Sequence, residues 1–448
     1  LMREAGVTIC YTAPTFYRQM APFARQMGLS QLRTSMSAGE GLPDATRQLW
    51  KEATGLDMTD GIGATEMFHI FISSPGGESR RGAIGKVVPG YTAKVMDDDG
   101  NVVTTHWWID AYEALKRDTP QLRARDAARQ LHISEAELVA ADPASLSLRS
   151  DDWPGLLGQL ASLGRVMALT RNEACVHEKT GVYGQLSFDG KVGLALNPDI
   201  DLRIFLFHWR HAFALTHHSE RGPQRSVQFF DRHGDAIQKV FLTDASDVAA
   251  FDTLAAAWRH PALYLAVPDP RPARMAERAD HDIDLAAFQA GWRALNDVHQ
   301  FHGFLRDFGV SRQQGFRLAP PGQAWRVALN ATEHMLRSAA SRQLPIMAFV
   351  GNAGMIQIHT GPVQRIETVG AWLNVLDPGF NLHLREDLID AAWVTHKPGD
   401  SGVVTSLELF DRDGQSVVTF FGARKPGQPE QPAWQALMDS LPKEAGHG

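Results

Sequence analysis

The sequence predicts an α+β protein with two tandem repeats, each a large antiparallel β-sheet with flanking helices, preceded by a partial α/β segment. Three observations lead to this fold class. Turn and strand residues recur 180 positions apart, apolar alternating strands come in runs, and helical patterns lie outside those runs. Runs of strands with separate helices are typical of antiparallel sheets and not of βαβ units. A chain of 448 residues has room for roughly two to four domains.

The repeat is regular enough to indicate a duplication. Asn172 aligns with Asn352, Phe230 with Phe410, and Gly234 with Gly414, always at the same spacing. Because a constant offset over such a distance requires equal loop lengths, we favour duplication over coincidental matching of common turn residues. The sequences DRHGD and DRDGQ, each between apolar runs, predict one hairpin in each copy.

Helical patterns precede each copy. Residues 107–142 have helical periodicity, and Ser134 followed by Glu137 predicts a capping box. Residues 286–316 are predicted as a helix with one buried face, and beside that face the helix carries two histidines three positions apart. The Pro-rich and charged segment 268–282 is predicted as the linker, so we expect domains at 1–103, 108–267 and 283–448.

Composition excludes several classes of protein. The net charge of −7 argues against a nucleic-acid partner, since phosphates require a basic face. Cys10 and Cys175 are too few for a disulfide framework or a cysteine zinc cluster, and no apolar run is long enough to insert into a membrane. Without a leader segment we expect a cytoplasmic location, and we expect that upstream sequence is missing. The 18 histidines suggest metal or cofactor binding.

The histidine pair His299 and His302 has two interpretations from the residues alone. A histidine beside an apolar face is often a hydrogen-bonded core or surface residue. Histidines at this spacing could also bind zinc, but no cysteine or carboxylate nearby has suitable spacing, so a structural zinc site is disfavoured.

Residues 1–103 contain SAGEGLP, then GIGATE, then GAIGKVVPGYTAKVMDDDG, whose DDDG at 97–100 also predicts a hairpin. These segments resemble the adenylate-forming acyl-CoA ligases, and the resemblance implies that Thr65 and Glu66 face nucleotide phosphate and Mg²⁺. The phosphate loop, the ribose motif and the lid with its catalytic lysine are all absent. We therefore interpret 1–103 as a remnant or fusion scar without ligase activity, because adenylation needs all these parts.

Residues 108–448 contain, in order, NEACVHEKTG, LNPDIDLRIFL, SVQFFDRHGDA, DVHQFHGFL, VSRQQGF, FVGNAGMIQIHTG, AWVTHKPGDSG and FFGARKPG. Together they resemble the HemS/ChuS/PhuS family of cytoplasmic haem-binding proteins, also called haemin-degrading factors. The resemblance implies that His299 is the axial ligand of haem b and that His302 can take over coordination. It also implies that Arg203 lies on the opposite face of the haem, so we expect strands of both repeats at the site.

The same resemblance implies cations for the haem propionates, namely Lys397, Arg424 and Arg312. Haem also needs apolar walls, for which the candidates are Phe301, Phe380 and Phe421, although each could instead be plain core. Phe421 departs from the family's YGQR stretch, where a tyrosine would add a hydroxyl donor.

Two further positions limit the number of haem sites. His383 occupies the second-copy position of Arg203, so a second identical haem site is not expected. His177 could bind haem weakly, but we interpret it as a solvated histidine at a strand end. The other histidines at 208, 211, 217 and 218 are expected at the surface.

Three functions remain open. The first is a carrier that moves haem to a haem oxygenase or receives it from an inner-membrane importer. The second is an enzyme that opens the porphyrin oxidatively, in which Arg203 could stabilise developing negative charge. Since the sequence has no flavin or nicotinamide motif, such an enzyme would need an external electron donor. The third, an acyl-CoA ligase, is disfavoured.

Overall fold

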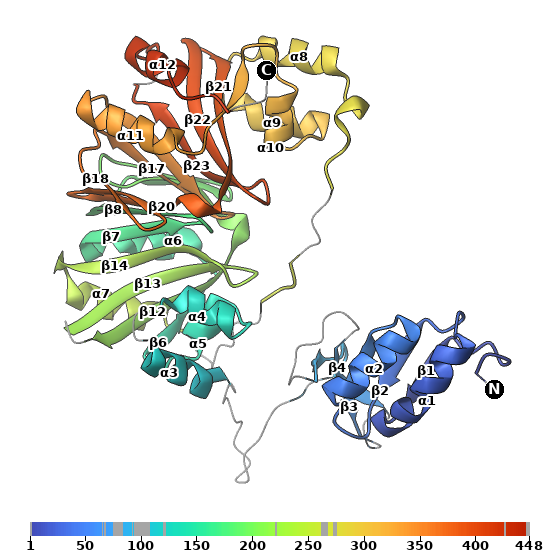
Figure 1. The fold of residues 1–448 in the computed structure, drawn as a ribbon. Coiled ribbons are helices and arrows are strands. Elements are labelled where there is room, and N and C mark those ends of the chain that lie inside the picture. The colour runs from blue at the N-terminus through green and yellow to red at the C-terminus, as the bar shows by residue number, and fades with distance from the viewer. Residues whose placement is uncertain are drawn as a thin grey trace. The chain divides into compact units, whose positions relative to one another are not determined.

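The structure is a computed structural model. It describes residues 2–64, 66, 69–74, 84–91, 93, 108–119, 122–219, 222–260, 268–271, 276–424 and 427–444. The chain forms two compact units, Leu1–Thr105 and His106–Gly448, and each is described by itself (Figure 1). The predicted hairpin at 97–100 and Thr65 lie outside the described residues, whereas Glu66 is described and exposed.

The first unit is a small α/β sheet. Its strands run in the order β1 (Ile9–Thr12), β2 (Thr34–Ser37), β3 (Met58–Gly63), β4 (Ile70–Ser74) and β5 (Lys86–Val87), with α1 (Pro14–Met27) and α2 (Asp44–Thr54) between the first three. Strands β1 to β3 pair in parallel, and β4 and β5 add antiparallel.

The core of the first unit lies between the two helices and the parallel strands. Tyr17 of α1 and Trp50 of α2 are fully buried, and their rings meet edge to face. Their polar atoms are satisfied as well: the Tyr17 hydroxyl donates to the Cys10 carbonyl at 2.7 Å, and the Trp50 indole donates to Ser35 at 2.9 Å. Burial of such aromatic groups requires these partners.

The second unit begins with the first repeat. Its elements are α3 (Trp108–Asp118), α4 (Ala124–Gln130), α5 (Glu135–Ala140), β6 (Ser145–Leu148), α6 (Trp153–Gln159), β7 (Gly164–Arg171), β8 (Cys175–Val182), β9 (Leu186–Asp189), β10 (Val192–Leu196), β11 (Asp201–Phe205), β12 (Trp209–Ser219), β13 (Gly222–Asp231), β14 (Ala236–Ser246) and α7 (Val248–Trp258).

The second repeat follows a similar order. Its elements are α8 (Leu285–Ala294), α9 (Gln300–Phe308), α10 (Arg312–Arg317), β15 (Ala324–Val327), α11 (Ala331–Ser341), β16 (Ile346–Gly351), β17 (Met355–Gly361), β18 (Ile366–Val369), β19 (Trp372–Asp377), β20 (Phe380–Arg385), β21 (Ile389–Gly399), β22 (Gly402–Asp411), β23 (Ser416–Gly422) and α12 (Pro432–Asp439). Strands β18, β21 and β22 begin and end 180 residues after β9, β12 and β13, so the duplication predicted from the sequence is present in the backbone.

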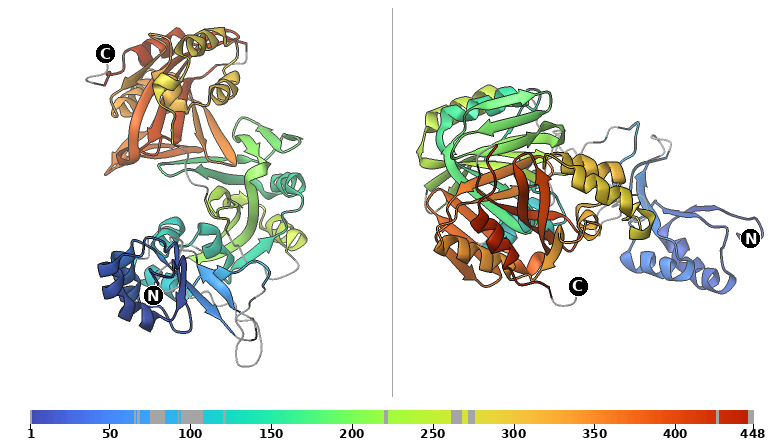
Figure 2. Two further views of the ribbon diagram at one scale, coloured as in Figure 1. Left: turned by 90° about the vertical axis from the view of Figure 1, so that its right-hand side faces the viewer. Right: turned by 90° about the horizontal axis from the view of Figure 1, so that it is seen from above.

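The predicted α+β fold with antiparallel sheets is confirmed, but the strands are shared between the repeats. The first sheet has the order β6-β12-β13-β14-β7-β8-β20-β19-β18, and the second has the order β15-β21-β22-β23-β16-β17-β11-β10-β9. Each sheet therefore takes six strands from its own repeat and three from the other. The joints are the antiparallel pairs β8–β20 and β11–β17, where both repeats run side by side (Figure 2).

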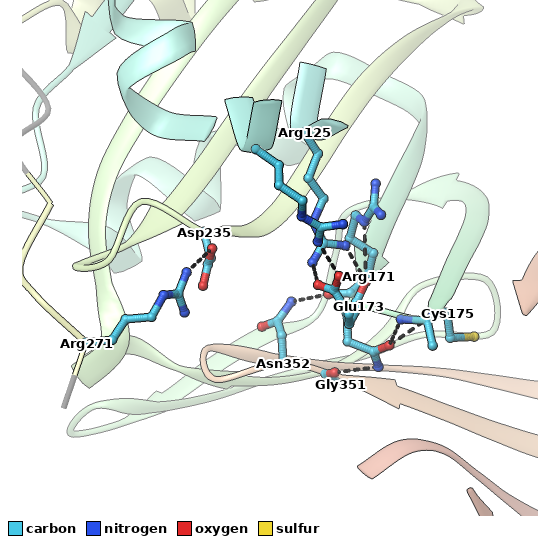
Figure 3. A network of polar contacts seen from close by, with 11 residues as sticks. Arg125, Arg171, Glu173, Cys175, Asp235, Arg271, Gly351 and Asn352 are labelled. Atoms are coloured by element: carbon cyan, nitrogen blue, oxygen red, sulfur yellow. Dashed lines mark hydrogen bonds and ion pairs between the residues drawn. The ribbon is translucent and has the colours of Figure 1, made fainter. Parts of the chain in front are cut away.

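Equivalent asparagines fasten the two repeats together. Asn172 donates its amide to the carbonyls of Gly351 and Val417, and Asn352 donates to those of Arg171 and Ile237. These distances are 2.7 to 3.0 Å, and each acceptor of Asn172 lies 180 residues after an acceptor of Asn352. The Gly351 carbonyl and the Asn352 side chain lie together at this junction (Figure 3). The constant spacing thus reflects a pseudo-twofold arrangement.

A polar layer fills the space between the sheets where β8 and β17 meet. Gln357 donates to His177 Nδ1 at 3.0 Å, and His359 stacks on Phe380 with ring centroids 3.7 Å apart. His177 is fully buried, so its prediction as a solvated strand-end residue is wrong. The reason is that β8 lies between β7 and β20, inside the sheet. His211 is buried too, contrary to the surface position predicted for it.

The helical segments are more broken than predicted. The single helix predicted over 286–316 is three short helices, α8 to α10, because Leu295 adopts an extended ψ of 139° and Gly309 adopts a left-handed φ of 64°. The segment 107–142 was predicted as helical with a short helix that begins after Ser134, and its described residues contain α3, α4 and α5. The predicted capping box at α5 is confirmed, since Ser134 and Glu137 exchange both hydrogen bonds.

The helices of the second repeat cover opposite faces of the second sheet (Figure 1). Its inner face packs on α11 and α12 through a large apolar core that contains Leu336, Phe420 and Trp434. On its outer face, α8 to α10 cover β21 and β22 through Trp292, Phe316 and Trp393. Within the described ranges, no helix combines the length and the apolar character needed to cross a membrane.

Candidate functional site

His299 is presented to solvent at the start of α9. It occupies the N-cap position, and its side chain is 89% exposed. The break between α8 and α9 explains this exposure, because the buried face of α9 is formed by Phe301 and Leu305 instead. An imidazole in this position can meet a large flat ligand, which a histidine inside a continuous helix on its buried face could not.

Asp297 fixes the orientation of this imidazole. One carboxylate oxygen, Oδ1, accepts from the His299 backbone N–H at 2.8 Å and lies 2.6 Å from His299 Nδ1. These hydrogen bonds from His299 lower the pKa of Asp297, and the nearby charge of Arg424 adds to the effect. An ionised Asp297 accepts only, so the neutral imidazole carries its proton on Nδ1 and has the Nε2 lone pair available.

A half-exposed apolar strip lies on the outer face of the second sheet. Met347 and Phe349 of β16, Ile356 of β17 and Phe421 of β23 belong to it. Met347 lies opposite Phe421 in the register, and the Phe349 and Phe421 rings meet edge to face at 5.1 Å. Such half-buried aromatic and aliphatic side chains are suited to a flat apolar ligand.

Arg203 comes from the first repeat but lies on this same face. In the shared sheet it is opposite Ile356 of β17, so the strand exchange brings it to the apolar strip. Its guanidinium is half-buried and forms an ion pair with Asp201. Strands of both repeats were expected at the site from the sequence, and this register brings them together.

Three charged side chains form a cluster beneath α9, in which Glu408 and Lys397 are buried and Arg312 is half-buried. Glu408 of β22 lies 2.5 Å from Arg312 Nε and 2.6 Å from Lys397 Nζ. Both cations also face the ring of Phe301, at 5.3 and 5.0 Å from its centroid. The cluster therefore ties α9 and α10 to the sheet directly beside the candidate site.

Burial controls the charges of this cluster. Burial lowers the pKa of Lys397 to about 8, although the Glu408 carboxylate opposes the shift. Burial alone would raise the pKa of Glu408, but Arg312 and Lys397 outweigh it and lower the value to about 2. A buried carboxylate with two cations is stable only as a set, because removal of one partner leaves an uncompensated charge.

The remaining predicted residues divide into two groups. His302 lies on α9 and is exposed, whereas Arg424 is half-buried, with its guanidinium 3.5 Å from Ser401 Oγ and near enough to affect Asp297. Phe301 and Phe380, predicted as possible haem walls, are core residues with 1% and 3% exposure. Phe301 fills the space under α9, and Phe380 lies in the layer between the sheets, so neither faces the apolar strip.

Sequence reasoning missed several residues of the site. The motif that contains His299 does not reveal Asp297 as its partner, although a spacing of two residues permits this contact. Glu408 was also missed, because only the register of β21 and β22 brings it to Lys397. The alternation of β16 could have indicated Met347 and Phe349. Among the described residues, no group of three His, Cys, Asp or Glu side chains could hold a bare metal ion.

The second unit matches known haem proteins over nearly its whole length. The family model for the haemin-degrading HemS/ChuX domain matches residues 132–258 and 309–441. The haemin transport protein HmuS of Yersinia pestis is 40% identical over 335 residues, which are 74% of this chain and 96% of that protein. The crystal structure of holo-PhuS, a haem-binding protein from Pseudomonas aeruginosa, is 46% identical, with a TM-score of 0.73 over 75% of this chain and 98% of that one.

A third relative is described as an enzyme. The structure of ChuS, a haem oxygenase of E. coli, is 37% identical, with a TM-score of 0.66 over 74% of this chain and 98% of that one. The relatives thus include proteins named for transport, for binding and for degradation of haem.

The first unit matches a different family. The AMP-binding enzyme model matches residues 1–106, and the benzoate–CoA ligase of Thauera aromatica is 43% identical over 106 residues. The match spans only 20% of that ligase, so the first unit is an AMP-binding fragment. Over the second unit the match includes both repeats. The chain therefore belongs to the haemin-degrading HemS/ChuX-domain family, with an AMP-binding fragment at its N-terminal end.

Proposed function

We propose that the chain binds haem b on the outer face of the second sheet, with His299 as the axial ligand of the iron. The observation that carries this proposal is the exposed imidazole whose Nδ1 bonds to Asp297, which leaves the Nε2 lone pair for a metal. Haem-binding relatives of the same family support haem as the bound group.

The neighbouring residues have the chemistry that haem requires. Met347, Phe349 and Phe421 offer an apolar and aromatic wall for the macrocycle. Arg203, held by Asp201, supplies a cation on the far side of the strip, opposite the helix that carries His299. His302 is one turn along α9 and could replace His299 during transfer.

The propionates require cations, for which we propose Arg424, Arg312 and Lys397. Arg424 and Arg312 are partly exposed and could reach a carboxylate without a change of fold. Lys397 is only 3% exposed and already pairs with Glu408. It could therefore bind a propionate only if α9 shifted or if its ion pair with Glu408 broke.

We propose that the protein is chiefly a carrier in cytoplasmic haem-iron uptake, which passes haem to a degrading enzyme or receives it from a membrane importer. A single hydrogen-bonded axial histidine with a second histidine nearby favours exchange of the ligand. The transport name of the HmuS relative supports this role.

Haem titration of the full chain tests the binding proposal. His299→Ala is expected to weaken haem affinity about 100-fold or to move the Soret maximum, because the iron loses its protein ligand. His302→Ala should have a smaller effect. His281→Ala is the matched control, since His281 is also exposed beside an aspartate. A His299→Ala protein with wild-type spectrum and affinity would refute the assignment.

The second candidate function is oxidative haem degradation, favoured by the ChuS relative and by the position of Arg203. The haem complex would be incubated with an external reductase in the presence of catalase. A verdohaem or biliverdin spectrum that persists with catalase supports an enzyme. A product that disappears with catalase reflects free peroxide and supports the carrier. Ligase activity is not proposed for the AMP-binding fragment.

A further inference from the structure

One neighbouring carboxylate, that of Asp297, holds His299 at the start of α9. Asp297 Oδ1 accepts two hydrogen bonds from the same residue, one from the backbone N–H of His299 and one from its ring. The peptide N–H of Gln300 in turn donates to the Asp297 carbonyl at 3.0 Å. The carboxylate is therefore held by the turn that starts α9, and its position does not depend on a ligand.

A second exposed histidine shows that such pairs differ in which nitrogen they engage. His281 faces Asp282 through Nε2, at 3.5 Å, which is too long for a good hydrogen bond. His299 faces Asp297 through Nδ1 at 2.6 Å. Of these two pairs, only His299–Asp297 has the length of a good hydrogen bond, and because it engages Nδ1, Nε2 is the ring nitrogen left to bind a metal.

We propose, on the basis of the proposed haem site, that Asp297 is a positioning residue that sets the tautomer of His299 and makes its Nε2 a stronger donor to iron. A carboxylate that accepts from Nδ1–H adds electron density to the imidazole, as carboxylates behind metal-bound histidines do in general. Stronger donation favours ferric over ferrous haem. Burial of the pair under a bound macrocycle would strengthen the hydrogen bond by removing water.

Two substitutions separate the geometric role from the electrostatic one. Asp297→Asn retains an acceptor oxygen for Nδ1–H and for the backbone N–H but removes the negative charge. Asp297→Ala removes the acceptor and the charge together. The matched controls are Asp282→Asn and Asp282→Ala, which alter the exposed pair that engages the other ring nitrogen.

The test uses haem complexes of the full-length variants, with three measurements: ferric haem affinity, the reduction equilibrium, and the iron–histidine stretch in the ferrous resonance Raman spectrum. We expect Asp297→Asn to keep ferric affinity within about threefold while the preference for the ferric state falls about tenfold and the stretching frequency decreases. Asp297→Ala should also lose affinity about tenfold. The Asp282 variants should match wild type in all three.

The outcomes separate this inference from the proposed function. If His299→Ala changes the haem spectrum but both Asp297 variants keep the wild-type stretch and reduction equilibrium, the inference is wrong and the haem site stands. If His299→Ala leaves the spectrum unchanged, the proposed site fails and the inference with it. A lower stretching frequency in Asp297→Asn with retained circular dichroism supports the inference, since general loss of structure would not leave the haem bound.

Discussion

The two sheets have equivalent strand orders, but their outer faces carry different charged side chains. Glu408 in the second repeat corresponds to Gln228 in the first, with a serine two residues before each. Gln228 donates to Ser226 at 3.0 Å, whereas Glu408 binds two cations. Arg203, on the second sheet, has His383 as its equivalent on the first sheet.

The residues that join the repeats and the polar residues of the outer faces differ in how well they keep the 180-residue symmetry. The positions that join the repeats keep the 180-residue symmetry, as the paired asparagines show. The polar outer positions do not keep it. On the first face, Lys239 pairs with Glu135 of α5 at the place where the second face has Thr419. Equivalent positions of the two faces therefore carry different side chains, and the proposed haem site lies on the second face.

The largest expected effect comes from making the second face like the first. Glu408→Gln introduces the residue type that the first repeat carries and leaves Arg312 and Lys397 without their counter-charge. We expect a loss of about 3–5 kcal/mol in unfolding free energy, measured by urea unfolding. The control is Glu333→Gln, whose partner Arg337 is largely exposed and whose loss should stay below about 1 kcal/mol. Equal losses of unfolding free energy in Glu408→Gln and Glu333→Gln would contradict a special contribution of the Glu408 cluster to stability.

Lowering the pH should reduce the difference in unfolding free energy between the wild-type protein and the Glu408→Gln variant. The folded-state pKa of Glu408, about 2, is below its ordinary value of 4.5, so its contribution is present above pH 4.5 and is lost as the pH falls toward 2. The gap in unfolding free energy between the two proteins should narrow by about 3 kcal/mol across this range. A gap that stays constant as the pH is lowered would rule out the ionised cluster as its origin.

The symmetric junction should respond symmetrically. Asn172→Ala and Asn352→Ala each remove two hydrogen bonds to backbone carbonyls. Each should lower unfolding free energy by about 1–3 kcal/mol. Thermal unfolding of both variants, compared side by side, checks this expectation. A large effect of one with none of the other would mean that the two halves are not equivalent at their joint.

The smallest effect tests the asymmetry of ligand binding. Arg203→Ala should weaken haem binding about fivefold, since it removes one partly exposed cation from the proposed face. His383→Ala, at the equivalent position of the other face, should not change it. Haem titration by absorbance measures both. A stronger effect of His383→Ala would move the proposed site to the first sheet.

Much of this fold could be predicted because the duplication leaves equivalent residues at a constant spacing in the sequence. The offset between Asn172 and Asn352 and the hairpins at DRHGD and DRDGQ depend on local turn chemistry, and the structure contains all of them. The exchange of strands between repeats could not be predicted, because the apolar alternation of β11 suits pairing with β8 of its own repeat as well as with β17 of the other repeat. Only packing of the whole unit decides between β8 and β17.

The site was predictable in its residue types and less so in their surroundings. His299 and Arg203 were found through motifs, although their roles stay predictions. The exposure of His299 could not be deduced, because the apolar periodicity predicted one continuous helix. In the structure α8 ends at Leu295 and α9 ends at Gly309. Burial of His177 and Lys397 depends on which strands flank them, and that information is absent from a single strand's pattern.

The most direct test of the central claim is a crystal structure of the haem complex with an anomalous map at the iron absorption edge. We predict one peak within bonding distance of His299 Nε2, with the macrocycle against Phe349 and Phe421. A peak beside the first sheet, or one that is distant from His299, would contradict it.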